Sequence, residues 1–155
     1  MRGKKAPKRE VYPDPVYHDK DVTRFVNKLM WCGKKTTAES VFYGAMAMIK
    51  EKTGEEGIEV FKRALENARP HVQVRSRRVG GSTYQVPIDI KPGKQIEHAM
   101  RWLIQYSRAR KGRPMTEKLA LELVDAAAGT GASVKKKDDT HRMAEANRAF
   151  AHYRV

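Results

Sequence analysis

The sequence contains one cysteine, Cys32, among its 155 residues. A single cysteine excludes an internal disulfide and any zinc site built from several cysteines. The chain also lacks an apolar run approaching the ~20 residues that a membrane-spanning helix needs. No apolar segment follows the basic start "MRGKKAPKRE", so a secretory signal peptide is absent as well. We therefore expect an intracellular, soluble protein.

Acidic residues are scarce relative to basic ones. The sequence has 18 Asp and Glu against 32 Lys and Arg, which gives a formal net charge of +14 and an isoelectric point near 10.0. A surplus of this size repels itself within a compact fold and indicates a polyanionic partner. Nucleic acid is the leading candidate and an anionic membrane surface the second. The basic residues are spread over several segments and not along one amphipathic helix, so we expect no membrane partner.

Motifs that carry catalysis are also missing. The segment "GKKTT" at Gly33 is preceded by Lys28 at the position where a phosphate-binding loop has its first glycine. The segment "GTG" at Gly129 follows no evident strand and is better explained as a helix stop. The histidines show no spacing typical of a metal site; they are His18, His71, His98, His141 and His152. We therefore expect no enzyme activity, no catalytic residue, no cofactor, no metal and no small-molecule substrate.

What the sequence does contain is helical periodicity. Apolar residues recur with the 3.6-residue period of an amphipathic helix and predict six short helices. The predicted inward positions are Val22, Phe25, Val26, Leu29 and Met30; Val41, Phe42, Ala45, Met48 and Ile49; Ile58, Phe61, Leu65 and Ala68; Ile96, Met100 and Leu103; Leu119, Leu123 and Ala127; and Met143, Ala146, Phe150 and Tyr153. Gly33, Gly54 and Gly129 are expected at helix ends. Thr36 and Glu39 form a predicted capping box.

These patterns predict a mainly α protein with a single helical domain over residues 19–155. Its helices are expected to form a bundle, preceded by a basic, extended N-terminal tail over residues 1–18. Pro13 and Pro15 disfavour helix in that tail, and its polar start is expected to become ordered only on an anionic partner.

One segment interrupts the helical pattern. The sequence "VRSRRVGGSTYQVPIDI" at residues 74–90 has alternating apolar residues after a pair of glycines. It predicts a protruding two-stranded antiparallel β-ribbon at about residues 72–90. An isolated ribbon is marginally stable in water. We therefore expect its base to pack on the helices and its tip to be mobile and free for contacts.

The register of this ribbon can be predicted from its side chains. A two-residue turn at Gly80–Gly81 would place apolar residues of the first strand opposite Asp89 and Pro87. Pairing Val79 with Thr83 avoids this and leaves a three-residue loop, a common hairpin connection. The predicted pairs are then Val72 with Ile90, Val74 with Ile88, Ser76 with Val86 and Arg78 with Tyr84. The second face would be polar and would carry Gln73, Arg75, Arg77 and Gln85.

The basic residues gather in windows without acidic ones. Between Glu66 and Asp89, and again between Glu97 and Glu117, every Asp and Glu is absent. The basic groups at 34–35 and 135–137 are expected at turns between helices, and the start of the tail is a further acid-free window. Each cluster alone is compatible with an ordinary solvated surface. Their recurrence in four places favours a set of phosphate contacts along one extended surface.

RNA is favoured over DNA as the polyanion, although composition leaves the choice open. No helix-turn-helix, zinc finger or basic zipper is evident. Arginine with Gln and Tyr on a ribbon suits irregular or single-stranded RNA, whose bases can stack on Tyr or on a guanidinium. The alternative is a DNA-architectural protein that uses a basic β-ribbon.

Four segments resemble one known family. They are "DKDVTRFVNKLM" at residues 19–30, "GKKTTAESVFYGA" at 33–45, "VRSRRVGGSTYQVP" at 74–87 and "ASVKKKDDTHRMAEANRAFAHYR" at 132–154. In this order they are similar to the family of bacterial small-subunit ribosomal protein number seven. The resemblance covers about residues 12–154, nearly the whole chain.

The resemblance implies a cytoplasmic, structural constituent of the small ribosomal subunit. It implies a primary binder of small-subunit ribosomal RNA that nucleates assembly of the head, the 3′ major domain. The family lies at the subunit interface, near exit-site transfer RNA and upstream messenger RNA. The resemblance also implies small-subunit ribosomal proteins nine and eleven as protein neighbours.

Transferred to this sequence, the resemblance and the charge clusters together give two sets of expected contact residues. Those expected to bind ribosomal RNA are Arg2, Lys4, Lys5, Lys8, Arg9, Lys34, Lys35, Arg69, Arg75, Arg77, Arg108, Arg110, Lys111, Arg113, Lys135, Lys136, Lys137 and Arg142. Those expected to face exit-site transfer RNA and messenger RNA from the ribbon are Arg78, Val79, Gly80, Gly81, Ser82, Thr83 and Tyr84.

Overall fold

A computed structural model describes residue 3, residues 6–7 and residues 9–153 of the chain. Within these residues it has six α-helices, one short 3-10 helix and one two-stranded antiparallel sheet. The elements are α1 (Lys20–Leu29), α2 (Lys35–Thr53), α3 (Gly57–Asn67), β1 (Val72–Val79), β2 (Ser82–Asp89), α4 (Pro92–Ala109), α5 (Met115–Ala127), α6 (Ala132–Ala146) and η1 (Arg148–Tyr153). The predicted class, a mainly helical fold with a β-ribbon, is confirmed.

The core lies where α1 to α5 meet. Phe25, Phe42 and Phe61 come from three different helices and are each 0% exposed. The ring centroids of Phe25 and Phe42 are 5.7 Å apart, and the centroid of Phe61 lies 5.1 Å from that of Phe25 and 5.3 Å from that of Phe42. The ring of Phe61 stands edge-on to the other two, a geometry that aromatic quadrupoles favour. Helices α4 and α5 complete this core with the fully buried Met100, Leu103, Leu119 and Leu123. The predicted apolar stripes therefore converge on one centre.

Helix ends differ in part from the prediction. Gly54 ends α2 in the left-handed conformation, with φ of 74°, as predicted. The capping box was a wrong prediction, because α2 begins at Lys35 and its N-cap, Lys34, makes no side-chain capping bond. Thr36 lies inside the first turn of the helix, where its hydroxyl cannot cap. Gly33 lies in the turn after α1 and does not end it, because the C-cap of α1 is Met30.

The ribbon has a different register from the predicted one. Val79 pairs with Ser82, which leaves a two-residue turn at Gly80–Gly81 in place of the predicted three-residue loop. Both glycines have positive φ, 56° and 90°, as the hairpin turns that match strand twist require. The predicted register was chosen to pair apolar side chains of one strand with apolar side chains of the other. In the structure the glycine turn sets the register, and Val74 pairs with Pro87.

The shifted register changes which residues share a face. Arg75 lies opposite Val86 and Arg77 lies opposite Tyr84. Directly paired residues project to the same side of a sheet, so both arginines share the face of the buried Val86. The predicted polar face for this pair, with Tyr84 on the other side, was wrong. Arg78 pairs instead with Thr83, and Ser76 with Gln85, and these side chains form the polar face.

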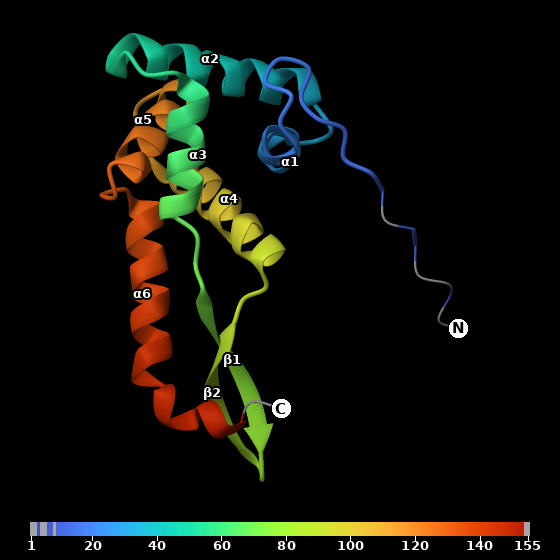
Figure 1. Cartoon of the computed structure of the whole chain (residues 1–155), viewed down its shortest axis with the longest axis vertical. Helices are drawn as coiled ribbons and strands as arrows, with labels where there is room; N and C mark the ends of the chain where they lie inside the picture. Colours follow the sequence, from blue (N-terminus) through green and yellow to red (C-terminus); the bar gives the residue numbers. More distant parts are fainter. Residues whose placement is uncertain (1–2, 4–5, 8, 154–155) are drawn as a thin grey trace.

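The ribbon and the C-terminal part of the chain form an arm, defined here as β1, β2, α6 and η1. Figure 1 shows α6 running beside the ribbon and η1 crossing it near the tip, away from the other helices. Tyr84 packs against Phe150 and Tyr153, with ring centroids 5.4 and 5.0 Å apart. The strands are therefore supported close to the tip by the chain's own aromatic residues, which the sequence prediction of a free tip did not include.

Helix α6 also departs from the prediction. Residues 135–137 lie inside this helix and not in a turn between helices. Met143, a predicted inward residue, is 47% exposed. Beyond Thr140 the helix leaves the core and follows the ribbon, so one of its sides stays open to solvent. The structure replaces the end of the predicted last helix with η1, which holds Phe150 and Tyr153.

The end of the predicted tail is attached to α2. Asp14 is 3% exposed, and one carboxylate oxygen accepts a hydrogen bond of 2.7 Å from the hydroxyl of Tyr43. Its other oxygen accepts bonds from the backbone N–H groups of Val16 and Tyr17. Burial and the bond to Asp14 raise the pKa of Tyr43. These contacts hold residues 14–17 against the helical domain, and the division of the chain at residues 18–19 stays a prediction.

Candidate nucleic-acid interface

Three adjoining hollows follow α1 and α4 along one side of the helical domain. Their volumes are about 860, 340 and 460 Å³. Lys28 lines the first and the second, and Arg108 lines the second and the third, so the three hollows adjoin in a row that can be treated as one groove. We call it the α1–α4 groove and define it by its basic residues Lys91, Lys28, Arg101, Arg108 and Lys34.

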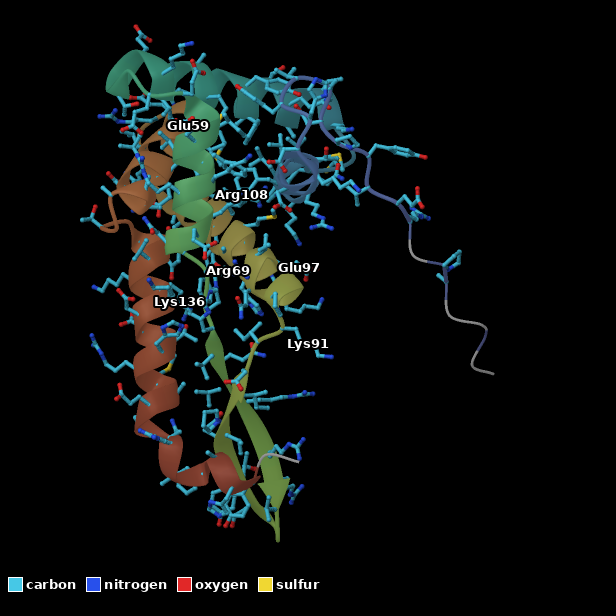
Figure 2. All side chains as sticks on the ribbon, viewed as in Figure 1. Glu59, Arg69, Lys91, Glu97, Arg108 and Lys136 are labelled. Atoms are coloured by element: carbon cyan, nitrogen blue, oxygen red, sulfur yellow. The ribbon has the colours of Figure 1, made fainter. Side chains whose placement is uncertain are left out.

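These five cations are exposed and form no ion pair within the described residues. Glu97 nevertheless lines the first hollow, and its pKa is lowered by its bond to Lys94 and also by the nearby charges of Lys28 and Arg101. In the described part of the chain, no carboxylate lies within 4.0 Å of any of them. Two further cations of the first hollow are paired: Arg24 with Asp21 at 3.1 Å and Lys94 with Glu97 at 2.9 Å. Exposed charges that the protein leaves unneutralised are available to phosphate. Figure 2 shows Lys91, Glu97 and Arg108 following one another along α4.

Helical spacing explains why α4 presents its basic residues together. Arg101, Gln105 and Arg108 stand four and three residues apart and therefore share one face. The other face buries Met100 and Leu103 in the core. Burial of the apolar side thus fixes the direction of the basic side, and the groove is built on a rigid element.

Arg108 is held in place by two contacts. Its Nη2 donates a hydrogen bond of 3.0 Å to the backbone carbonyl of Leu29, the last residue of α1. A guanidinium is favourable there, because the carbonyls at a helix C-terminus lack helical partners and carry partial negative charge. The guanidinium carbon also lies 5.0 Å from the centre of the Trp31 ring. Arg108 therefore connects α4 to the turn between α1 and α2.

The pair Lys34 and Lys35 lies at the start of α2. A helix N-terminus offers free N–H groups and partial positive charge, and two adjacent lysines add to this field. The ammonium of Lys35 forms an ion pair with the carboxylate of Glu39, with Nζ 3.6 Å from Oε1. Lys34 lies in the turn between two helices, as predicted, and lines one end of the α1–α4 groove, whereas Lys35 is already the first residue of α2.

Several predicted contact residues have partners within the protein. Arg110 donates to Glu122 at 2.7 and 3.0 Å and also pairs with Asp125. Arg69 donates to the side chain of Gln95 at 2.7 Å. The remaining pairs are Arg69 with Glu66, Arg113 with Glu117, Lys137 with Asp138 and Arg142 with Asp139. Ribosomal RNA contacts of these residues stay predictions and would compete with the internal ion pairs.

The arm carries a second basic region. Arg75, Arg78, Lys135 and Lys136 have no carboxylate within 4.0 Å among the described residues. Figure 2 places Lys136 on α6, on the opposite side of the molecule from Lys91. The predicted contact residues are therefore not gathered on one surface. Some line the α1–α4 groove, and others lie on the arm.

Other predicted residues lie elsewhere. Arg2, Lys4, Lys5 and Lys8 fall outside the described residues. Arg9 and Lys35 line a fourth hollow of about 330 Å³, which shares Val11 and Asn27 with the first hollow of the groove. Lys111 is exposed in the connection between α4 and α5, beside the glycine of that turn. Val79, Gly80, Gly81, Ser82 and Thr83 are exposed at the ribbon tip, whereas Tyr84 is half-buried.

Three residues of the groove were missed by the sequence prediction. Lys28 and Lys91 are single lysines beside acidic or apolar neighbours, so they formed no cluster. Arg101 belonged to an acid-free window but was not selected. The spacing of seven residues between Arg101 and Arg108 is the signal that would have placed both on one helix face.

Two further features concern the part of the chain that the structure describes, membrane-spanning helices and metal-ligand clusters. There, no helix has the length and apolar character that crossing a bilayer requires. In the same part of the chain, no group of three or more His, Cys, Asp or Glu side chains has the geometry of a metal site.

Comparison with known proteins decides the family. The model of the family "Ribosomal protein S7p/S5e" matches residues 1–148. The chain belongs to this ribosomal protein family. The predicted resemblance is therefore confirmed, and with it a structural, RNA-binding protein of the small ribosomal subunit that is not an enzyme.

Curated relatives of the S7p/S5e family match over nearly their full length. The chain is 57% identical to small ribosomal subunit protein uS7 of Caldanaerobacter subterraneus subsp. tengcongensis over 149 residues, 96% of each chain. It is 56% identical to the uS7 protein of Thermotoga petrophila over 154 residues, 99% of each chain. The uS7 protein of Helicobacter hepaticus is 57% identical over 154 residues, also 99% of each chain.

Proposed function

We propose that this protein acts in the cytoplasm as a primary binder of small-subunit ribosomal RNA and nucleates folding of the 3′ major domain. In this proposal the α1–α4 groove holds the RNA backbone. The observation that carries it is the row of five exposed cations without a carboxylate partner along one groove. Phosphates held by such cations release counterions, which gives affinity that falls steeply with salt.

The arm has a separate role in the proposal. The exposed tip residues from Val79 to Thr83, together with Arg78, reach toward exit-site transfer RNA and upstream messenger RNA. Support comes from the shape of the arm, which extends away from α1 and α2 (Figure 1). Packing of Tyr84 on Phe150 and Tyr153 stiffens the ribbon, so the tip is presented in a defined position. Tyr84 acts there as a supporting residue.

Small-subunit ribosomal proteins nine and eleven are the proposed protein neighbours, as the resemblance implies. Basic residues of the tail and of α6 add ribosomal RNA contacts outside the groove. The partly satisfied cations Arg69, Arg113, Lys137 and Arg142 contribute less, because each must exchange an internal carboxylate for phosphate.

Binding to a fragment of the 3′ major domain of small-subunit ribosomal RNA tests the proposal. Filter binding across a salt series compares this fragment with an unrelated structured RNA of equal length and with bent duplex DNA. We expect tighter binding to the ribosomal fragment at every salt concentration. Equal affinity for both RNAs at matched ionic strength would contradict the proposal, and a preference for bent DNA would favour the architectural alternative.

A further inference from the structure

We propose that Trp31 forms a stacking site for one unpaired RNA base at the end of the α1–α4 groove. The site consists of the Trp31 ring, the guanidinium of Arg108 and the apolar hollow between them and α2. The inference rests on the proposed function, because it names the part of the RNA that this end of the groove receives. The backbone of the same nucleotide and its neighbours would lie on the adjacent cations.

The Trp31 side chain is unusually open. It is 69% exposed, although tryptophan is among the residues that proteins bury most effectively. Trp31 is not one of the predicted inward residues, and in the structure α1 ends before it, at Leu29. The Arg108 guanidinium lies over one face of the ring, and the remaining exposed surface of the indole offers stacking area to a base, since every base has a matching π-face.

The turn that carries Trp31 is well defined. The N–H of Lys34 donates to the carbonyl of Trp31 at 3.0 Å and closes the turn between α1 and α2. Cys32 and Gly33 within it both have positive φ, 51° and 74°. For a non-glycine residue this conformation is uncommon and is held by its surroundings. The indole is therefore presented from a defined backbone turn.

The hollow beside Trp31 has the size and lining of a base-binding site. Its volume is about 460 Å³, within the range of small-ligand pockets. Its floor is apolar and is formed by Leu29, Ala38, Val41 and Met115. A flat, weakly polar base would exclude water from this floor while one face rests on the indole.

Charge decides between RNA and an apolar protein segment as the occupant. Lys34 and Arg108 line the same hollow, and neither has a carboxylate within 4.0 Å among the described residues. The hollow also continues through Arg108 into the rest of the groove, where Lys28 and Arg101 stand. An apolar segment of a protein would leave these cations unmatched, whereas a nucleotide brings a phosphate with its base.

The test combines affinity with tryptophan fluorescence. The chain has two tryptophans, so Trp102→Phe leaves Trp31 as the sole indole reporter. The probe is the 3′ major-domain RNA fragment, at several salt concentrations. We expect the emission of Trp31 to be quenched on binding. We expect Trp31→Ala to lose about 5- to 150-fold in affinity, the range for one stacked base, while Trp31→Phe retains most of it.

The salt dependence separates stacking from charge. Trp31→Ala should leave the slope of log affinity against log salt unchanged, whereas the matched variant Lys34→Gln should lower it by about 0.7 to 0.9. Wild-type affinity for Trp31→Ala together with unquenched emission would overturn the stacking site and leave the proposed function intact. If the wild-type protein does not prefer the ribosomal fragment to unrelated RNA, the proposed function fails, and the stacking site fails with it.

Discussion

At the scale of single residues, Arg110 shows how an apparent RNA contact can be a structural group. Its partner Glu122 has a side chain that is 1% exposed. The other carboxylate oxygen of Glu122 accepts bonds from the backbone N–H and the hydroxyl of Ser133, at 3.1 and 2.9 Å. A buried carboxylate is tolerated only when it is paired and hydrogen-bonded. Glu122 thus links the end of α4 to the start of α6 through α5.

Replacing Arg110 with alanine should destabilise the protein. Glu122 would keep its bonds to Ser133 but lose the opposite charge while remaining buried. We expect the free energy of unfolding to fall by about 2 to 3 kcal/mol, less than for a fully buried pair, because the Arg110 side chain is 30% exposed. Urea unfolding measures the change, and Lys111→Ala, at an exposed neighbouring position, should stay within about 0.5 kcal/mol. Equal stability of the two variants would show that Arg110 is not a structural residue.

Two histidines make stability depend on pH. Burial lowers the pKa of His141, and Lys137 and His71 lower it further. Burial and Arg101 lower the pKa of His98. The unfolded chain therefore binds more protons than the folded one below the ordinary histidine pKa of about 6.5. The contribution of His98 and His141 to the free energy of unfolding is therefore complete above the ordinary histidine pKa. It is lost as the pH falls toward their lowered pKa values.

Unfolding in urea between pH 7 and pH 5 should show this loss. The backbone N–H of His71 donates to Nε2 of His141 at 3.1 Å, a bond that protonation of that nitrogen would break. We expect the unfolding free energy of the wild type to decrease over this range and that of a His98→Gln, His141→Gln double variant to change less. A wild-type stability that is constant or rises toward pH 5 would contradict the account.

At the scale of elements, the ribbon shows where sequence reasoning succeeded and where it failed. Its existence and its limits follow from alternation around Gly80–Gly81 and were predicted correctly. Its register was not, because the packing partners of each face come from distant parts of the chain. Val86 is buried and Tyr84 is covered by Phe150 and Tyr153, contacts that no local pattern indicates. Val74 is half-buried although it pairs with Pro87 and not with Ile88, the partner predicted for it.

A pair of substitutions tests the observed packing of the ribbon. Val86 is 0% exposed and Val79 is 37% exposed, although both are valines of one ribbon face. We expect Val86→Ala to lower the free energy of unfolding by about 1.5 to 2.5 kcal/mol, from lost burial and a small cavity. Val79→Ala should cost less than about 0.5 kcal/mol. Thermal melts of the two variants measure the difference, and a larger effect at Val79 would contradict the burial of Val86 as the main packing contact of this face.

The helices were easier to predict than the ribbon, for a physical reason. Helical period depends on neighbours three and four residues away, so the stripes through Phe25, Phe42 and Phe61 were visible in the sequence. The last stripe failed at Met143 because α6 leaves the core and follows the ribbon. That path depends on tertiary packing, which the amphipathic pattern alone does not contain.

At the scale of the whole molecule, a net charge of +14 predicted a polyanionic partner but not its position. Acid-free windows selected Lys34 and Arg108, which line the proposed groove, and they also selected Arg110, which is paired internally. Lys28 joins the site only because α1 packs beside α4. The groove is thus a property of the assembled helices, and its cations come from α1, α4 and the turn before α2.

The claim that this groove is the ribosomal RNA interface can be tested with matched charge variants. The test variant carries Lys28→Gln, Arg101→Gln and Arg108→Gln. Its control carries Lys50→Gln, Lys62→Gln and Arg63→Gln, which removes the same charge from cations paired with Glu56, Asp19 and Glu55. The two variants have equal net charge, so a difference between them reports on position.

The measurement is the slope of log affinity against log salt for the 3′ major-domain fragment. Each lost phosphate contact lowers the slope by about 0.7 to 0.9. For the groove variant we expect a decrease of about 2 to 3 relative to the wild type, and for the control a slope close to that of the wild type. Equal decreases in both variants, or a decrease only in the control, would contradict the assignment of the α1–α4 groove as the RNA interface.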